Sequence, residues 1–444
     1  MQNTTHTLQT DCLIVGGGPA GYGAMMAFLG SGNSSAILVE RHGFIGGMGT
    51  AAGLSSYLNH RIEGFNVGDS VYRKLVQDLK NQGGSYYDPV SMGDYFEPEV
   101  CKSVMESNIL KAGGTIVYHS FLSTVEKEGD FWIAGFLSKG ASIKIKTRYL
   151  VDCTGDGDAA QKAGATMTHG RKSDGMAQPM SMVVQLGGFD PQAWSKAGHR
   201  LLDDRYALNG DCFEDEIADA KNKGLWSIPR ENIALLWSMP ADPSRVTING
   251  TRIQGLSACD PLQMTAGEIE GRRQALVLRD FFRQYIPGFS DCYIVNTGPQ
   301  LGVRESRRIV GMETLSEEHV LKGERPKSSI AFCSYPIDIH DSDGSGTQFD
   351  MGNHVKIYGI GWPCLLPESL SNLVVAGRCI SASHEAAGSF RVMPTCMGLG
   401  QAAGTGVAMA LESKKELRSI EGSEIRTRIE TDPESFQSTA LSNK

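Results

Sequence analysis

Apolar residues recur along the chain with the spacings of strands and helices. Four apolar residues in a row at 12–15 and again at 36–39 indicate two short buried strands, with helical spacing between them. Val71, Leu75 and Leu79 share one helical face. These spacings predict helices over 68–83 and 97–112, a strand pair over 115–125, and strands within 131–152.

The pattern changes after residue 165. Residues 178–187 and 245–255 alternate as strands, while 191–235 is charged and partly helical. A capping-box sequence, Thr265 to Glu268, predicts that a long helix begins there and stops before Pro287. This region has three tryptophans that are either core residues or a stacking wall for a ring, and both alternatives are open: Trp194, Trp226 and Trp237.

The last third returns to buried elements. Residues 372–376 form an apolar strand, and a Gly/Ala-rich helix follows over 395–411. We expect an α/β fold: a Rossmann-like domain with a parallel sheet and a β-meander, interrupted by an inserted α+β substrate domain. The expected parts are 1–165 and 336–412 for the first domain, 166–335 for the insertion, and 413–444 for a charged surface tail with a frayed end.

A glycine motif follows the first strand. Gly16, Gly18 and Gly21 have the G-x-G-x-x-G spacing, a helix follows, and Glu40 ends the second strand. In dinucleotide sites the glycines allow a tight turn, a close approach to the pyrophosphate and close helix packing, and the acid accepts from ribose hydroxyls. The complete context favours a dinucleotide site over a generic glycine turn.

Composition and charge narrow the partners. The chain has 444 residues, 53 of them glycine, and a net charge of -8, which argues against nucleic acid and anionic membranes. No apolar run reaches the roughly 20 residues that span a bilayer, and residues 1–10 show no leader pattern. Ten cysteines without a C-x-x-C pair favour reduced thiols, a cytoplasmic protein and no metal site.

Several longer segments carry a resemblance to known flavoproteins. Three segments resemble the glutathione-reductase-like (GR2-type) superfamily: the glycine-rich stretch 41–50, the segment 151–158 and the final strand–helix pair. Within this superfamily, the similarity to the FAD-dependent oxidoreductase family extends over about 11–411. Four segments carry it, namely 302–311, 334–341, 376–381 and 384–396.

The resemblance implies non-covalent FAD, since the loop 46–53 has no histidine to form a covalent link. It places the backbone of Leu122 at the adenine and the start of the last helix at the flavin pyrimidine edge. A helix N-terminus there would stabilise the negative charge of reduced flavin. The implied cofactor residues are Gly16, Gly18, Pro19, Ala20, Gly21, Glu40, Arg41, Gly47, Met48, Leu122, Thr154, Gly155, Asp158, Gly377, Arg378, Thr395, Cys396, Met397 and Gly398.

Four side chains are candidates for chemistry. His340 and His384 are candidate proton donors or acceptors, with structural histidines as the alternative. Arg304 and Arg391, with the neighbouring Arg307 and Arg308, would recognise a carboxylate or enolate, or would form structural ion pairs.

The expected function is an FAD-dependent oxidoreductase that transfers a hydride between flavin N5 and a small organic substrate. The alternatives are a flavin monooxygenase with NAD(P)H as a transient electron donor, an RNA-modifying flavoprotein, and a non-enzymatic flavin-binding protein. The acidic composition disfavours RNA. A homo-oligomer is compatible with the sequence.

Overall fold

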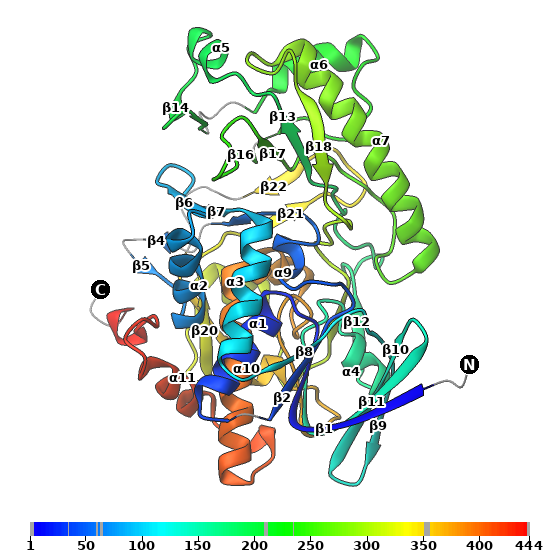
Figure 1. The fold of residues 1–444 in the computed structure, drawn as a ribbon, viewed down its shortest axis with the longest axis vertical. Coiled ribbons are helices and arrows are strands. Elements are labelled where there is room, and N and C mark those ends of the chain that lie inside the picture. The colour runs from blue at the N-terminus through cyan, green and yellow to red at the C-terminus, as the bar shows by residue number, and fades with distance from the viewer. Residues whose placement is uncertain are drawn as a thin grey trace.

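The chain is described from a computed structural model (Figure 1). The structure describes residues 4–33, 35–58, 61–62, 65–207, 212–233, 235–349 and 356–441. Two bodies of regular structure are stacked along the long axis, the larger containing both ends of the described chain.

The larger body is built on a seven-stranded mixed sheet, which confirms the expected fold class. Its parallel part runs in the order β8-β2-β1-β11, with β24 beside the end of β11. The meander β9-β10-β11 continues the sheet antiparallel. The strands are β1 (Thr4–Val15), β2 (Ala36–Val39), β8 (Thr115–Val117), β9 (Phe121–Glu128), β10 (Phe131–Ser138), β11 (Ala141–Asp152) and β24 (Leu373–Val375).

The first strand is longer than the sequence predicts. Only 12–15 was expected, but β1 begins at Thr4 and pairs with β11 from Ala141 onward. Residues 5–9 are exposed, so no apolar alternation marks them. The expected pairing within 115–125 is wrong, because β8 pairs with β2 and β9 pairs with β10.

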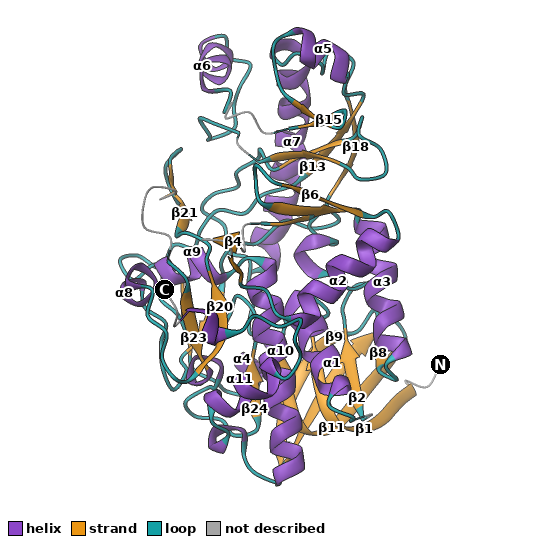
Figure 2. Cartoon of the chain, turned by 90° about the vertical axis from the view of Figure 1, so that its left-hand side faces the viewer, coloured by secondary structure: helices purple, strands orange, loops and turns teal. Residues whose placement is uncertain are grey.

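Helices α1 (Pro19–Gly30) and α10 (Met393–Ser413) cross in close contact over one face of the sheet (Figure 2). A Cβ added to Gly400 would lie 1.9 Å from the carbonyl oxygen of Ala20, and one added to Gly404 would lie 2.1 Å from that of Ala24. Only glycine lets these two backbones approach so closely. The contact joins the two ends of the sequence in one core.

The inserted body has its own sheet and core. Strand order is β16-β17-β13-β18, and the helices α5 (Pro191–Lys196), α6 (Glu214–Asn222) and α7 (Pro261–Tyr285) cover it at the top of Figure 1. Trp194 and Trp226 lie in this core, and Trp237 is buried against Tyr95, so all three are packing residues. The strands are β13 (Val184–Gly187), β16 (Leu236–Ser238), β17 (Val246–Ile248) and β18 (Tyr293–Thr297).

The last part of the expected insertion, which ends at 335, packs in the core of the larger body. Three of its residues lie there: Leu315 just before α8 (Glu317–Lys322), Val320 within α8, and Ile330 on β20 (Ser329–Cys333). The apolar core of the insertion has its last residues near β18, well before 335.

Two helices begin upstream of their expected starts. The long helix α7 begins at Pro261, because the Asp260 carboxylate accepts hydrogen bonds from the backbone N–H groups of Leu262 and Gln263. Asp260 followed by Pro261 is therefore the true cap, and the capping-box sequence at Thr265 lies inside the helix. Helix α10 begins at Met393, with Pro394 in its first turn.

The C-terminal segment is docked rather than an exposed tail, which corrects the expectation for 413–444 over the part described. Ile425 and Ile429 of α11 (Gly422–Glu430) are buried in the main core. Arg426 is buried and pairs with Asp69 at 3.0 Å and with Glu430 at 2.6 Å. Charged residues in the sequence suggested a surface, but this guanidinium is buried with paired carboxylates.

The remaining elements complete the surface between and around the two bodies. They include α2 (Ser70–Asn81), α3 (Pro98–Lys111), α4 (Asp158–Lys162), α9 (His384–Phe390), β3 (Ser56–Tyr57), β4 (Arg61–Ile62), β5 (Phe65–Asn66), β6 (Ser85–Asp88), β7 (Gly93–Phe96), β12 (Met167–His169), β14 (Leu201–Leu202), β15 (Arg205–Tyr206), β19 (Arg307–Ile309), β21 (Asp338–His340), β22 (Thr347–Phe349) and β23 (Tyr358–Gly361). Across the described ranges, we find no helix with both the length and the apolar content needed to cross a membrane.

The α1–α10 contact predicts that G400A destabilises the protein by about 1–3 kcal/mol, the usual cost of overpacking a core. The backbone of Ala20 must move to admit the new methyl group. The measurement is the free energy of unfolding from urea denaturation. Gly30 at the end of α1 has open space around it, so G30A is the matched control and should be neutral or stabilising. A G400A protein as stable as wild type would contradict the packing argument.

Candidate functional site

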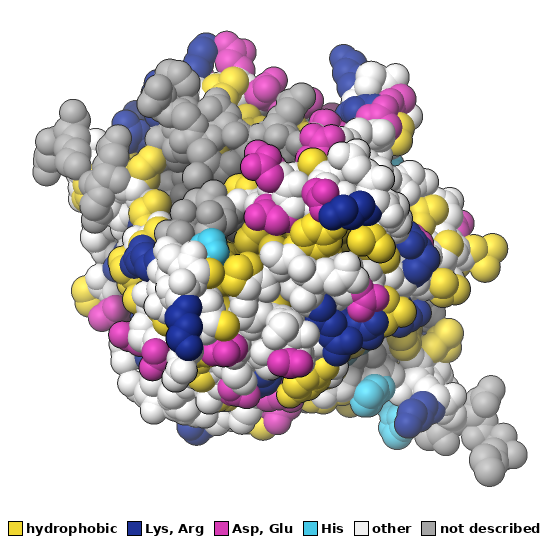
Figure 3. Space-filling view, turned by 90° about the horizontal axis from the view of Figure 1, so that it is seen from above, with side chains coloured by type: hydrophobic (Ala, Val, Ile, Leu, Met, Phe, Trp, Pro, Cys, Tyr) yellow, Lys and Arg dark blue, Asp and Glu magenta, His cyan; other side chains and the backbone are white. Residues whose placement is uncertain are grey.

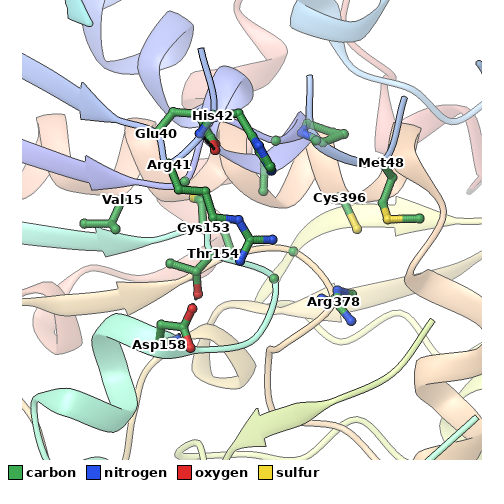
Figure 4. Close-up of a pocket in the computed structure, with 18 of the residues that line it drawn as sticks. Val15, Glu40, Arg41, His42, Met48, Cys153, Thr154, Asp158, Arg378 and Cys396 are labelled. Carbon is green, nitrogen blue, oxygen red and sulfur yellow. Dashed lines mark hydrogen bonds between the residues drawn. The ribbon is translucent and has the colours of Figure 1, made fainter. Parts of the chain in front are cut away.

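A cleft opens where β1, β2 and β11 end and α1 begins (Figure 4). In that view Val15, Glu40 and Asp158 lie toward one end, and Met48, Cys396 and Arg378 toward the other. The lining residues are Val15, Gly16, Gly18, Pro19, Ala20, Val39, Glu40, Arg41, His42, Gly47, Met48, Ser120, Phe121, Leu122, Cys153, Thr154, Gly155, Asp158, Gln300, Ala376, Gly377, Arg378, Arg391, Met393 and Cys396.

The glycine turn after β1 is fixed by steric demand. Gly16 has φ +98°, and a Cβ there would lie 2.5 Å from the carbonyl oxygen of Cys153. A Cβ on Gly21 would lie 1.9 Å from the carbonyl oxygen of Gly16. Gly21 therefore serves the packing of α1 against the turn, as the third glycine of the motif should.

Glu40 holds this turn in place from the end of β2. Its Oε2 accepts a hydrogen bond of 2.7 Å from the N–H of Gly17, and its Oε1 accepts one of 2.9 Å from the N–H of His42. The side chain is buried yet lines the cleft. It can therefore shape the loop and still present a carboxylate to a ligand.

Two helices begin at the cleft with open N-termini. The N-cap residues Gly18 of α1 and Val392 of α10 give no side-chain cap, and neither helix has an acid in its first turn. Pro19 and Met393 from these first turns line the cleft. The free N–H groups and the positive ends of both helix dipoles favour negative charge in the cleft.

The loop after β11 is held by a buried carboxylate. Asp152 accepts hydrogen bonds from the N–H and the hydroxyl of Thr154 and, at 2.7 Å, from the N–H of Ala160. Burial raises the pKa of Asp152 to about 6, although these hydrogen bonds lower it. Asp158 beyond the loop forms an ion pair with Arg307.

Arg378 follows β24 and lines the cleft, and only one of its two terminal nitrogens is hydrogen-bonded among the described residues. Its Nη2 donates to Asp156 Oδ1 at 2.5 Å. Its Nη1 is buried and has no hydrogen-bond partner among the residues that the structure describes. A buried donor of this kind is costly without an acceptor, so an acceptor atom of a ligand in the cleft would be favourable here.

The structure brings most of the expected cofactor residues to one cleft and leaves a few outside. Gly21, Thr395, Met397 and Gly398 do not line it; the last three are buried within α10, where Gly398 faces Asp69 and Ala331. Gln300 lines the cleft without any sequence signal. Its Oε1 accepts a hydrogen bond from Arg41, so a residue far along the chain completes the wall.

Other lining residues were not singled out from the sequence. Val15 and Val39 are the last residues of β1 and β2, and Cys153 follows the last residue of β11. The strand pattern of the sequence could have indicated them, because ligands bind at the carboxyl ends of parallel strands. His42 follows Glu40 and contacts Gln300 Oε1 at 3.0 Å.

The two histidine candidates lie outside the cleft. His340 Nδ1 accepts from Arg252 at 3.1 Å, and its Nε2 faces Asp338 at 3.4 Å. Burial and then Arg304 lower the pKa of His340 to about 3, although Asp338 opposes them, so the ring is neutral near pH 7. His384 Nδ1 lies 2.8 Å from Glu305.

The arginine candidates divide into two groups. Arg307 and Arg308 pair with Asp158 and Glu305, as in the structural interpretation. Arg391 lines the cleft and contacts Asp338 at 3.3 Å. Arg304 donates only to the carbonyl oxygen of Pro179 and to Ser181 Oγ, both at 2.8 Å, among the described residues.

The thiols near the cleft are poor nucleophiles. Burial raises the pKa of Cys396 to about 12 and that of Cys379 well above its usual value. Within the described part of the chain, no group of three or more His, Cys, Asp or Glu side chains is arranged to hold a metal ion.

Comparison with known proteins identifies the family. Residues 11–429 match the family described as FAD dependent oxidoreductase. A comparison with curated proteins gives no match.

Solved structures with similar folds cover most of the chain at low identity. One is p-nitrophenol 4-monooxygenase from Pseudomonas putida DLL-E4, with 9% identity, 99% of this chain and 92% of that one covered, and a TM-score of 0.50. Another is a geranylgeranyl bacteriochlorophyll reductase-like protein from Thermoplasma acidophilum, with 13% identity, 96% and 83% covered, and a TM-score of 0.44. A flavin-dependent brominase has 12% identity, 95% and 83% covered, and a TM-score of 0.46.

Acid should destabilise the protein through His340. Its pKa is near 6.5 in an unfolded chain and about 3 here, so between these values the unfolded state binds more protons and stability falls as pH falls. H340Q should therefore lose less unfolding free energy than wild type on acidification from pH 6.5, by about 1 kcal/mol per pH unit. Urea denaturation at several pH values measures this, with H6Q at an exposed position controlling for loss of a histidine. Identical slopes for wild type and H340Q would contradict the assignment.

Proposed function

The chain belongs to the FAD dependent oxidoreductase family, and on that premise we propose that it binds FAD non-covalently in the α1–α10 cleft and oxidises or reduces a small organic molecule there. The observation that carries the proposal is the pair of uncapped helix N-termini on one cleft. FAD has two electron-rich regions that suit them, the pyrophosphate and the flavin pyrimidine edge.

The residues present fit this cofactor. The N–H groups of Gly18 and Ala20 at the start of α1 would hold the pyrophosphate, and Glu40 would accept from the adenosine ribose. Leu122 and Phe121 offer an apolar wall for the adenine. The unpartnered Nη1 of Arg378 supplies a further donor to the cofactor.

When bound, FAD supplies a two-electron centre that accepts or gives a hydride at N5. The protein's part is to exclude water, orient the substrate and stabilise charge. The first turn of α10, which carries Met393 and Cys396 at the cleft, would stabilise the negative charge that reduction adds to the ring edge. The substrate would lie between the two bodies, beside Arg391 and Met48 of the cleft lining.

The proposal extends to the finer family and to the partners. The glycine-rich segment after Glu40 and the segment 151–158 support placement in the glutathione-reductase-like (GR2-type) superfamily. The net charge of -8 supports the absence of nucleic-acid and membrane partners, and the ten cysteines without a C-x-x-C pair support a cytoplasmic protein. Figure 3 shows basic and acidic side chains interspersed over the face of the molecule seen from above, without a continuous basic face for a nucleic acid. A homo-oligomer is also compatible with the sequence.

A second candidate function is a monooxygenase reduced by NAD(P)H. The sequence has a single G-x-G-x-x-G after a strand, so a nicotinamide would bind transiently beside the flavin rather than in its own dinucleotide site. We therefore favour a dehydrogenase or oxidase that takes electrons from its organic substrate.

The role of Glu40 predicts that E40Q weakens FAD binding about tenfold or more. An amide cannot accept from both Gly17 and His42, so the turn loses one of its two charge-assisted bonds. Flavin absorbance per protein after desalting, followed by FAD titration, gives the dissociation constant. E126Q on the exposed side of β9 is the matched control. Equal flavin retention by E40Q and wild type would exclude this role for Glu40.

The choice between the two functions predicts the response to nicotinamide. The visible spectrum of the purified protein should show flavin bands, and these should persist for minutes after anaerobic addition of NADH or NADPH. Rapid bleaching would favour the monooxygenase instead. Absence of flavin bands even after reconstitution with FAD would exclude the cleft as an FAD site.

A further inference from the structure

Four arginines gather where the inserted body meets the cleft. Arg304 lies within the electrostatic reach of Arg230, Arg252 and Arg391, and the carboxylate of Asp338 is the one acidic group among these neighbours. We call these four arginines the arginine cluster. Asp341 and Glu231 act on Arg252 from its other side.

The arginine cluster is assembled from separate parts of the chain. Arg230 precedes β16 and Arg252 follows β17, so both belong to the insertion, while Arg304 follows β18 and Arg391 ends α9. No local sequence pattern brings them together. Their meeting point is the junction between the two bodies.

The arginine cluster borders the cofactor cleft. Arg391 lines that cleft directly. Gly302, two residues before Arg304, lies so close to Met48 that an added Cβ would be 3.1 Å from the Met48 Cε atom, and Met48 also lines the cleft. A ligand held by the cluster would therefore lie beside the end of the cleft formed by Met48 and Cys396.

Backbone carbonyls, rather than carboxylates, hold two of the guanidiniums in place. Arg230 donates to the carbonyl oxygens of Asn232 and Asn249. Arg252, which is fully buried, donates to those of Gly344 and Gly346. These bonds to neutral oxygens fix the positions of the two side chains, while the carboxylates that act on them, such as Asp338, do so at longer range.

Arg304 has the most hydrogen-bonding capacity left. Both of its hydrogen bonds among the described residues come from Nη1, and they go to neutral oxygens. The side chain is half-buried, and the edge formed by its Nε and Nη2 makes no hydrogen bond among the described residues. That edge presents two parallel N–H groups, the geometry that binds a carboxylate through both oxygens.

The electrostatics agree with this geometry. Burial, and then Arg391 and Arg230, lower the pKa of Arg304 well below its usual value. Burial and then Arg252 lower the pKa of Arg230 to about 10. Like charges at this spacing repel one another, so binding of an anion among them would be favourable.

A second observation at the same place also indicates a ligand. Gln178 is 2% exposed, and its Oε1 accepts from the N–H of His340. Its Nε2 is buried without a partner among the described residues. Arg307 and Arg308 nearby each form an ion pair with a carboxylate, whereas Arg304 and Gln178 retain N–H groups without an acceptor among the described residues.

We propose that the arginine cluster binds the carboxylate group of the enzyme's small organic substrate, with the open edge of Arg304 as the principal contact. This inference rests on the proposed function for its place beside the flavin. The carboxylate would anchor the substrate at the junction of the two bodies, leaving the rest of the molecule toward Met48 and the first turn of α10.

The test is binding of simple carboxylates to the FAD-loaded protein. Benzoate and succinate are the probes, benzamide is the neutral match for benzoate, and inorganic phosphate is the competing anion. Two readouts are followed: the shift of the flavin absorption bands and the rise in melting temperature. We expect saturable binding of benzoate or succinate and none of benzamide.

The variant R304Q should weaken carboxylate binding by about tenfold to a hundredfold, the range for hydrogen bonds to charged groups. It should retain FAD as wild type does, because Arg304 does not line the cofactor cleft. R304K keeps the charge without the planar fork and should give an intermediate affinity. R428Q, which removes an exposed arginine of α11, is the matched control and should bind as wild type does.

Several results would overturn the proposal. They are failure of both carboxylates to bind, equal binding to wild type and R304Q, wild-type affinity in R304K, and tighter binding of phosphate than of either carboxylate. If R304Q does not fold, R304K alone tests whether the planar guanidinium of Arg304 binds the carboxylate: a weaker affinity in R304K supports this contact, and wild-type affinity contradicts it. If wild-type protein holds no FAD, the proposed function fails, and the melting temperature still tests the carboxylate site.

Discussion

The close contact between α1 and α10 is the constraint on which the rest of the structure depends. Gly400 and Gly404 bring the two helix backbones together at a distance that no other residue allows. Because the helices begin beside the same strand ends, their free N-terminal N–H groups meet at one cleft. The electrostatic character of the site thus follows from a packing fact within the core, where burial of apolar surface supplies the stabilisation.

Local patterns predicted the parts of this site that are local. The spacing of Gly16, Gly18 and Gly21 and the position of Glu40 indicated the turn, because steric demand and strand–helix geometry act over a few residues. The predicted start of α7 is wrong because two cap-like residues, Asp260 and Thr265, lie five residues apart, and only the first is followed by proline. The exposed half of β1 gave no signal, since its side chains face solvent on both sides.

Contacts between distant segments were beyond the sequence pattern. Gln300 reaches Arg41 across the junction of the two bodies, and four arginines from four segments converge near Asp338. The charged C-terminal segment likewise looked like a surface, although Arg426 is buried between Asp69 and Glu430. In each case the partner of a charged or polar residue comes from a distant segment that only the tertiary fold brings close. Residue type alone predicts that such side chains are exposed to solvent.

The contact between α1 and α10 also sets the order in which the protein can be completed. Ala20 and Gly400 are neighbours in space but lie at opposite ends of the sequence, so the nucleotide turn exists long before the helix that closes its cleft is synthesised. Until then α1 exposes the apolar surface that α10 will cover, a condition in which chains are prone to misassemble. Only a chain synthesised through α10 presents both helix ends to a ligand, so a cofactor that needs both ends can bind only after α10 has folded onto α1.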